Sequence, residues 1–511
     1  MKKLIGVVVI VLVLAAAGMT GAAYWSGMQA ERWYREALAE GSRNPNVKFE
    51  TVHYQRGLFS SQSVTRVQFA MPEGHEPNEP NPSFSIRQNI YHGLLPLAGW
   101  GVPGVPMQWT GAVVRATLDP DSSAWTRELA KWYGNQEPVV AISQVGFDGA
   151  SDTRITMPPL TLNDVEDVQS LKFAGLRGQF QVAARAAAVQ GNLTVSSLEA
   201  VGKPTAGEGQ PAGGNVRVDL RDLTMTVNQR KGAFDLLFGD SSFKVGELSV
   251  RDQGTGTPFV VTNLSMTGSL SQQGPQQVAG EVLVKADKVA VDRQSGTGSM
   301  KMALRNLDGA TIAQLQQWQQ TMASKPDDPQ ALDELLRLVK TLLRGKPEFV
   351  LDTQATLTQG EWQGKLTLNF QDFGDVNLLL NPAGLLGALE KGLAEVTASK
   401  ALVETLLADA IKEQLQAQTQ DQGQQTGEQA LQSMATQQAA QQLQGLTSAG
   451  FIRLEGGLYK STARFEGGKL FVNGQEIPLA PAESQEDDGA TEDEMPLEPD
   501  GGAEEEETPQ K

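Results

Sequence analysis

Between residues 216 and 373 the chain repeats one pattern of apolar and polar positions. Apolar residues alternate with polar ones, two polar residues follow, and the alternation then resumes one position out of step. Strict alternation places one face of a β-strand against a core, and a bulge or sharp bend can absorb the extra residue. The pattern therefore predicts a long, curved antiparallel sheet of kinked strands. The polar pairs are Arg221-Asp222, Gly246-Glu247, Thr262-Asn263, Asp287-Lys288, Arg305-Asn306 and Gln371-Asp372.

Helical patterns interrupt and follow this region. Apolar stripes at helical spacing predict helices over 308–322 and 329–344, which we expect to pack on the sheet. Residues 382–446 are predicted to be helical and are rich in glutamine, with 14 glutamines between Gln414 and Gln444. A partly disordered connector is the alternative there. With these helices the expected fold class is mainly β with α, an α+β protein.

Turn residues define the remaining β parts. Residues 45–210 contain short alternating runs separated by Pro- and Gly-rich stretches, which exclude helix and predict strands joined by ordered turns. Residues 211–381 form the second β-rich part. In the segment 447–480, Gly467-Gly468 and Asn473-Gly474 predict the tight turns of a closing β-hairpin region.

The N-terminus predicts a membrane anchor. Lys2 and Lys3 precede an uncharged run of 20 residues, 4–23, which as a helix would span the ~30 Å hydrocarbon core of a bilayer. Residues 1–25 are therefore expected to be an uncleaved signal anchor, with the N-terminus cytoplasmic and the body in the periplasm of a bacterium. A signal peptide cleaved near Ala15–Ala17 is the alternative. Residues 26–44 predict a helical stalk.

Charge and cysteine content narrow the function classes. Of the formal net charge of −18, a share of −12 lies in residues 481–511, which predicts a disordered acidic tail. Solvation is the usual role of such a tail, and a weak arm for divalent cations or basic partners is the sharper interpretation. No basic stripe exists to bind nucleic acid. The lack of cysteine excludes disulfides, thiolate catalysis and thiolate-bound zinc.

Histidine chemistry is sparse. His75 lies in a Pro-rich loop between Glu73 and Glu76, where solvation is favoured over metal binding. His92 precedes Gly93 and could titrate near neutrality, but we expect its ring to anchor a turn through a hydrogen bond.

Other motifs are equally weak. Arg56-Gly57 beside Phe59 and Ser60 could bind an anion, although a structural turn is the favoured interpretation. Gly360–Lys365 is one residue short of a phosphate loop and falls at a predicted hairpin. No catalytic residue, cofactor or metal is therefore predicted.

Two motifs that follow the anchor carry a resemblance to a known family. They are YQRGLFSS at 54–61 and IYHGLLPL at 90–97, and the closing hairpin adds GGKLFVNGQEIPL. Over residues 1–480 the chain is similar to the YdgA-like family of bacterial envelope proteins, a domain of unknown function, although Leu94 departs from the family's His-Gly-Pro pattern. The resemblance implies an inner-membrane anchor and a periplasmic body, and it supplies no reaction or substrate. The motif positions, of open role, are Tyr54, Arg56, Gly57, Phe59, Ser60, His92, Gly93 and Pro96.

These observations favour a non-enzymatic envelope protein whose sheet binds lipid, or another hydrophobic envelope component, in a β-groove. The kinked strands are also similar to the repeating grooves of AsmA- and TamB-like proteins, which are associated with phospholipid transport. A scaffold for envelope protein partners is the alternative, and a hydrolase with an unrecognised Asp/Glu site comes third. An apolar face open to solvent would support ligand binding, whereas a face covered by helices 308–344 and 382–446 would support the scaffold.

Overall fold

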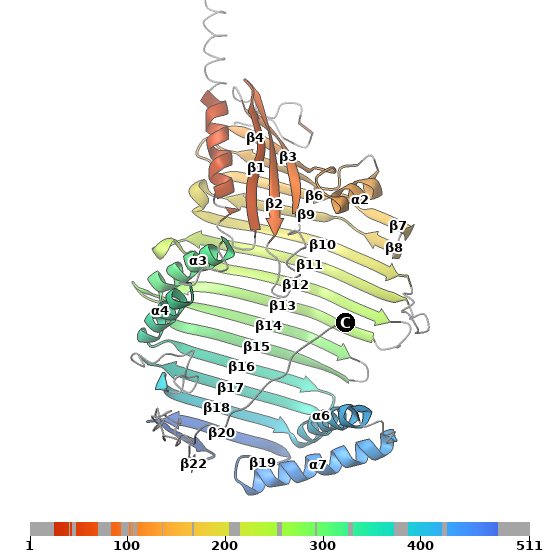
Figure 1. Ribbon diagram of the computed structural model, residues 1–511, viewed down its shortest axis with the longest axis vertical. Helices are drawn as coiled ribbons and strands as arrows, with labels where there is room; N and C mark the ends of the chain where they lie inside the picture. Colours follow the sequence, from red (N-terminus) through yellow and green to blue (C-terminus); the bar gives the residue numbers. More distant parts are fainter. Residues whose placement is uncertain are drawn as a thin grey trace, which may run out of the picture.

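The strands join into one open antiparallel sheet, seen edge to edge in Figure 1. The computed structural model describes residues 25–39, 41–42, 47–69, 83–92, 102–103, 105, 110–134, 136–165, 168–203, 215–252, 258–291, 294–324, 331–371, 387–421 and 427–478. Over these residues the chain is mainly β, as predicted. None of their helices has the length and apolar character needed to cross a membrane, and the predicted anchor, residues 4–23, lies outside the described ranges.

The first part of the sheet is built from short strands. Strands β1 to β6 pair in chain order, β6 pairs with β9, and both β8 and β9 pair with β10 (Ala188–Gly202). Helix α2 (Ala124–Tyr133) connects β4 to β5 and begins after a Ser123 cap. The other strands are β1 (Val47–Arg56), β2 (Ser60–Phe69), β3 (Ser83–His92), β4 (Ala112–Leu118), β5 (Val140–Val145), β6 (Ser151–Met157), β7 (Leu160–Val165), β8 (Val168–Phe173) and β9 (Leu176–Val182).

The second part continues the same sheet with longer strands. Each strand from β10 to β18 pairs with the next one in the chain. In Figure 1, β1–β3 run along the long axis while β10–β18 run across it, so the sheet twists strongly along its length. The strands are β11 (Val216–Lys231), β12 (Leu237–Asp252), β13 (Pro258–Gln272), β14 (Gln277–Val291), β15 (Gln294–Asp308), β16 (Glu348–Leu357), β17 (Gly360–Phe370) and β18 (Leu389–Ser399).

The predicted kinks lie inside the long strands. Asp222, Asn263 and Asn306 have positive φ angles of 52°, 50° and 59° in β11, β13 and β15, a conformation that Asp and Asn tolerate better than most residues. The β11–β12 and β12–β13 pairings keep one register on both sides of these positions. Between β14 and β15 the register shifts at Asp287-Lys288, as a bulge requires. For Gln371-Asp372, β17 ends at Phe370, and Asp372 with the residues that follow it lies outside the described ranges.

Both regions predicted to be helical, 308–344 and 382–446, contain helices. The helices α3 (Gly309–Ser324) and α4 (Ala331–Arg344) confirm the first prediction, and α6 (Lys400–Asp421) and α7 (Glu428–Ser448) confirm most of the second. Helix was wrongly predicted over 389–399. That segment is β18, which hydrogen-bonds to β17 on one side and to β20 on the other. Its residues favour helix locally, but pairing within the sheet prevails.

The closing hairpins match the prediction. Strand β20 (Leu458–Glu466) pairs with β18 and β21 (Lys469–Val472), and β21 pairs with β22 (Gln475–Ile477). The two turns have positive φ angles at both central residues, as type I′ turns need: 59° and 75° at Gly467-Gly468, and 51° and 87° at Asn473-Gly474. Strand β19 (Arg453–Glu455) also pairs with β20. The predicted acidic tail, 481–511, lies outside the described residues.

Candidate functional site

The first motif, residues 54–61, lies near the helix at residues 25–39, which runs alongside β1 in Figure 1. The predicted stalk is thus helical, and it packs against the sheet. Beneath it the buried side of β2 carries Ser61, Ser63 and Thr65. Thr65 and Thr51 lie within 3.0 Å of the Tyr34 hydroxyl, and Gln88 Oε1 accepts hydrogen bonds from Ser63 and Thr65. Because these buried hydroxyls are satisfied within the protein, the cluster can hold the helix in one position.

His92 belongs to this buried cluster. Its Nε2 lies 2.8 Å from Ser61 Oγ, and each of the two residues is 1% exposed. The ring also packs against Gly27, where a Cβ atom would lie 2.8 Å from His92 Cε1. Nearby, burial raises the pKa of Tyr54, an effect that the Ser61 side chain partly offsets. Burial leaves the Ser61–His92 pair without room for a substrate. The expected ring hydrogen bond is present, but it joins β2 to β3 within the sheet and does not anchor a turn.

The neighbouring motif residues form a tight turn. Gly57 N donates a hydrogen bond to Ser60 O at 2.9 Å, and a Cβ atom on Gly57 would lie 2.5 Å from that oxygen. Arg56 Nη1 lies 3.3 Å from Glu31 Oε2, so its charge is paired with the helix. Phe59 is exposed. This arrangement favours the structural turn over an anion site; Gly93, Pro96 and His75 lie outside the described residues.

Replacing His92 with alanine is expected to lower the free energy of unfolding by about 2–4 kcal/mol. The change removes a buried ring that packs on Gly27 and leaves the Ser61 hydroxyl without its partner. Equilibrium urea unfolding followed by far-ultraviolet circular dichroism measures the effect. His53→Ala is the matched control, because His53 is exposed in β1. Equal stability of the two variants would contradict the anchoring role.

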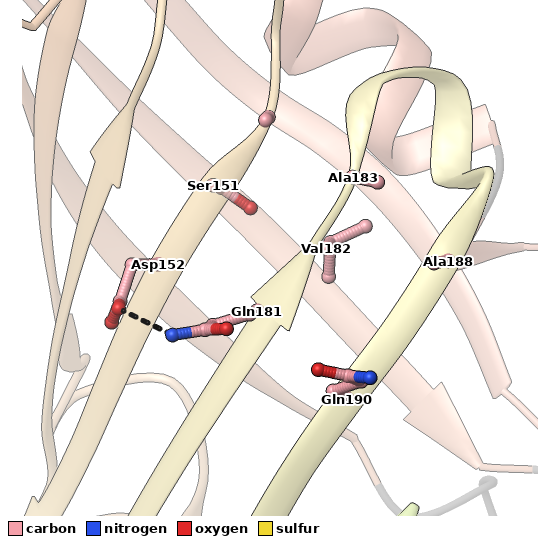
Figure 2. A pocket seen from close by; sticks show the side chains of 8 residues that line it. Ser151, Asp152, Gln181, Val182, Ala183, Ala188 and Gln190 are labelled. Atoms are coloured by element: carbon pink, nitrogen blue, oxygen red, sulfur yellow. Dashed lines mark hydrogen bonds between the residues drawn. The ribbon is translucent and has the colours of Figure 1, made fainter. Parts of the chain in front are cut away.

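A hollow lies at the ends of β6, β9 and β10 (Figure 2). Its volume is about 410 Å³. Asp152 accepts hydrogen bonds from the amides of Gln179 and Gln181 at 3.1 and 3.3 Å. Asp152 is the one ionisable side chain in the lining, so the hollow offers no acid–base pair. The lining residues are Ala150, Ser151, Asp152, Gln181, Val182, Ala183, Ala188 and Gln190.

Many charged groups elsewhere form ion pairs, and Arg217 with Asp219 is an example. Arg217 donates hydrogen bonds to the Asp219 carboxylate, the closest at 2.9 Å, and thereby holds the pKa of Asp219 below its ordinary value. A carboxylate held ionised in this way is poorly suited to accept and release protons near neutrality. Within the described ranges no three His, Asp or Glu side chains gather as metal ligands would.

The candidate functional site is instead an open apolar face on β11–β15. Residues paired across an antiparallel sheet share a face, and Met225, Phe243, Met266, Val284 and Met300 pair in one row across these five strands. Met225 and Met266 are each 47% exposed and Met300 is 38% exposed. The neighbours of this row on the same face are Val227, Val282, Met302 and Leu304. We call the row and these neighbours together the apolar strip.

In the part of the chain that the structure describes, helices pack at one end of this face and on the strands that continue the sheet beyond it. At that end α3 and α4 pack with Leu270 around a core of Leu236, Val278 and Leu307. Beyond the face, α6 contacts β17, β18 and β20, where Ala398 and Tyr459 are buried. Within the strip, Met225, Met266, Met300 and Leu304 are exposed, and the other residues are half-buried.

The opposite face of the same strands is mainly polar, with Leu283 as an apolar member of its row. Four of its residues are each adjacent in the chain to a residue of the strip. They are Thr226, Ser242, Thr267 and Lys301. Period-two alternation in the sequence predicted this division. The buried hydroxyls of Ser61, Ser63 and Thr65 were missed, because a polar residue on a buried face gives no signal in a hydrophobic pattern.

Comparison with known proteins gives a family and no activity. No curated protein matches the chain. No solved structure matches it either. Residues 1–480, nearly the whole chain, match a family described as bacterial protein of unknown function. The chain therefore belongs to that family, DUF945.

Proposed function

We propose that this is a non-enzymatic envelope protein, anchored in the inner membrane by residues 4–23, whose periplasmic body binds the acyl chain of a lipid on the apolar strip. The observation that carries the proposal is the exposure of Met225, Met266 and Met300 in one row of the sheet. Contiguous exposed apolar surface of this kind marks binding sites in soluble bodies.

The dimensions of the strip suit an acyl chain. Five neighbouring strands at a spacing of ~4.8 Å make the row about 19 Å long. One acyl chain occupies about half of the ~30 Å hydrocarbon core of a bilayer, or about 15 Å. A chain of that length can lie along the row from Met225 to Met300.

The chemistry of the strip also suits a ligand that varies in shape. Methionine side chains are unbranched and polarisable, and they adapt to irregular apolar ligands. The strip contains four of them, Met225, Met266, Met300 and Met302. The row itself contains no charged or hydrogen-bonding side chain, so it would recognise hydrocarbon rather than a headgroup. The resemblance to the YdgA-like family and the apolar run at 4–23 support a location beside a bilayer.

Site-specific photo-crosslinking in living cells tests the proposal. A photoreactive phenylalanine analogue placed at Met266 or Met300 is expected to give lipid adducts, detected by mass spectrometry of the purified chain. The same analogue at Thr267 or Lys301, the next residues in the chain, points to the polar face and should give none. Adducts with proteins alone at positions 266 and 300 would reject lipid binding in favour of the scaffold.

A further inference from the structure

A second group of exposed apolar side chains lies far from the strip, at the start of the described chain. Trp25 is 51% exposed, Met28 41%, Leu58 41% and Phe59 55%. Trp25 and Met28 belong to the helix at 25–39, and Leu58 and Phe59 form the turn between β1 and β2. We call these four residues the apolar tip.

Three contacts bring the two halves of the tip together. The backbone N–H of His92 donates to Phe59 O at 2.9 Å, and the His92 ring packs on Gly27, between Trp25 and Met28 in the chain. Arg56, beside the turn, pairs with Glu31, one helical turn farther on. The helix start and the β1–β2 turn therefore lie at the same end of the body, the top in Figure 1.

The turn itself directs Leu58 and Phe59 outward. Gly57 and Ser60 close it through the backbone hydrogen bond described above, and the contact of Gly57 with Ser60 O leaves no room for a side chain there. The two residues between them are large, apolar and exposed. Polar residues are the usual occupants of tight turns, so two apolar residues here call for an apolar environment.

The chain that precedes the tip indicates what that environment is. The 20 uncharged residues 4–23 end two positions before Trp25. Aromatic residues directly after such a run lie at the membrane–water interface. We propose that the apolar tip inserts into the outer interface of the same bilayer, with Leu58 and Phe59 as a second contact beside the anchor. This inference rests on the anchor in the proposed function and adds an orientation of the body to it.

Two contacts with the bilayer would fix the body, whereas an anchor alone leaves it free to tilt. With the tip in the interface, the helix at 25–39 and β1–β3 point away from the membrane, and β10–β22 lie progressively farther out (Figure 1). Arg56 is paired with Glu31, so insertion would depend on apolar contact more than on anionic headgroups. The apolar strip is then held at a set height above the bilayer.

Fluorescence quenching on the full chain tests this orientation. The chain has no cysteine, so Phe59→Cys can be labelled uniquely with the fluorophore NBD and reconstituted in phosphatidylcholine vesicles. Phe69→Cys is the matched control, because Phe69 is 42% exposed at the other end of β2, ~30 Å away. Nitroxide-labelled lipids are expected to quench the label at position 59 at least threefold more than the label at position 69.

The outcomes separate this inference from the lipid-binding proposal. Adding Leu58→Asp to the labelled Phe59→Cys chain is expected to reduce the quenching, since it places a charge in the interface. Equal quenching at 59 and 69, in a chain that resists alkaline carbonate extraction, would overturn the tip while leaving the anchor intact. A chain that carbonate extracts would overturn both tip and anchor. Lipid adducts at Met266 do not depend on either result.

Discussion

Replacing Gly239 with alanine is expected to lower the free energy of unfolding by about 3 kcal/mol or more. Gly239 lies in β12 with a φ of 135°, which side chains of L-residues rarely allow. A Cβ atom there would lie 2.1 Å from the Asn228 carbonyl oxygen and 3.0 Å from Gln229 Cα. Both atoms belong to the backbone of β11, which cannot move aside without breaking its own pairing. Equilibrium urea unfolding, followed by far-ultraviolet circular dichroism, measures the loss.

Gly268→Ala provides the matched control for this substitution. Gly268 lies on the adjacent strand β13, its backbone has no positive φ, and a Cβ atom there would meet nothing within 4 Å. Alanine at that position should change the stability by less than about 1 kcal/mol. A Gly239→Ala variant as stable as Gly268→Ala would show that β11 and β12 do not approach each other as described.

Changing Met225 and Met266 together to aspartate is expected to weaken lipid capture at least tenfold. Each methionine is about half exposed, so covering it with an acyl chain contributes about 1 kcal/mol. The aspartates remove that contribution, and a bound acyl chain would also have to desolvate two carboxylates. A loss of 1.4 kcal/mol already corresponds to a factor of ten. The measurement is the fraction of the anchored chain that a clickable, photoactivatable phospholipid labels in membranes.

The Thr226→Asp and Thr267→Asp double variant controls for charge and for position. Each threonine is the next residue in the chain and faces the polar side of the same strand. This variant should be labelled as well as the unmodified chain. Equal labelling of both double variants would remove the apolar strip as the binding surface. Because the methionines are partly exposed, the aspartates are expected to leave folding intact, which circular dichroism can verify.

Most strands, kinks and turns of the large sheet could be predicted from the local pattern of apolar and polar residues. Polar pairs such as Arg221-Asp222 and Thr262-Asn263 contain the residue that adopts the left-handed conformation. The positions of these kinks can therefore be predicted from the sequence of each strand alone. The Gly467-Gly468 and Asn473-Gly474 turns are equally local. Strand β18 is the counterexample: its 389–399 segment contains helix-favouring residues, and only its two neighbours in the sheet make it a strand.

The candidate site could be predicted only in part. Alternation predicts that β11–β15 have one apolar face, but what covers a face depends on where distant helices fold. The packing of Leu270 with α3 and α4, and the burial of Ala398 near α6, are long-range contacts of this kind. The partnership of Ser61 with His92 links residues 31 positions apart, and the side chains alone carry no signal of it.

The order of the strands has a consequence for how the molecule forms. From β10 to β18, every strand pairs with the strand just before it. Most of these pairs close short loops, whereas β16 pairs with β15 only after α3 and α4 have been passed. Sheets assembled from such neighbouring hairpins have low contact order and avoid the slow search typical of interleaved β topologies. The sheet can therefore grow as the chain emerges, each finished strand serving as a template for the next. Completion waits for β20, which must cross α6 and α7 to reach β18, and we expect that last step to set the folding rate.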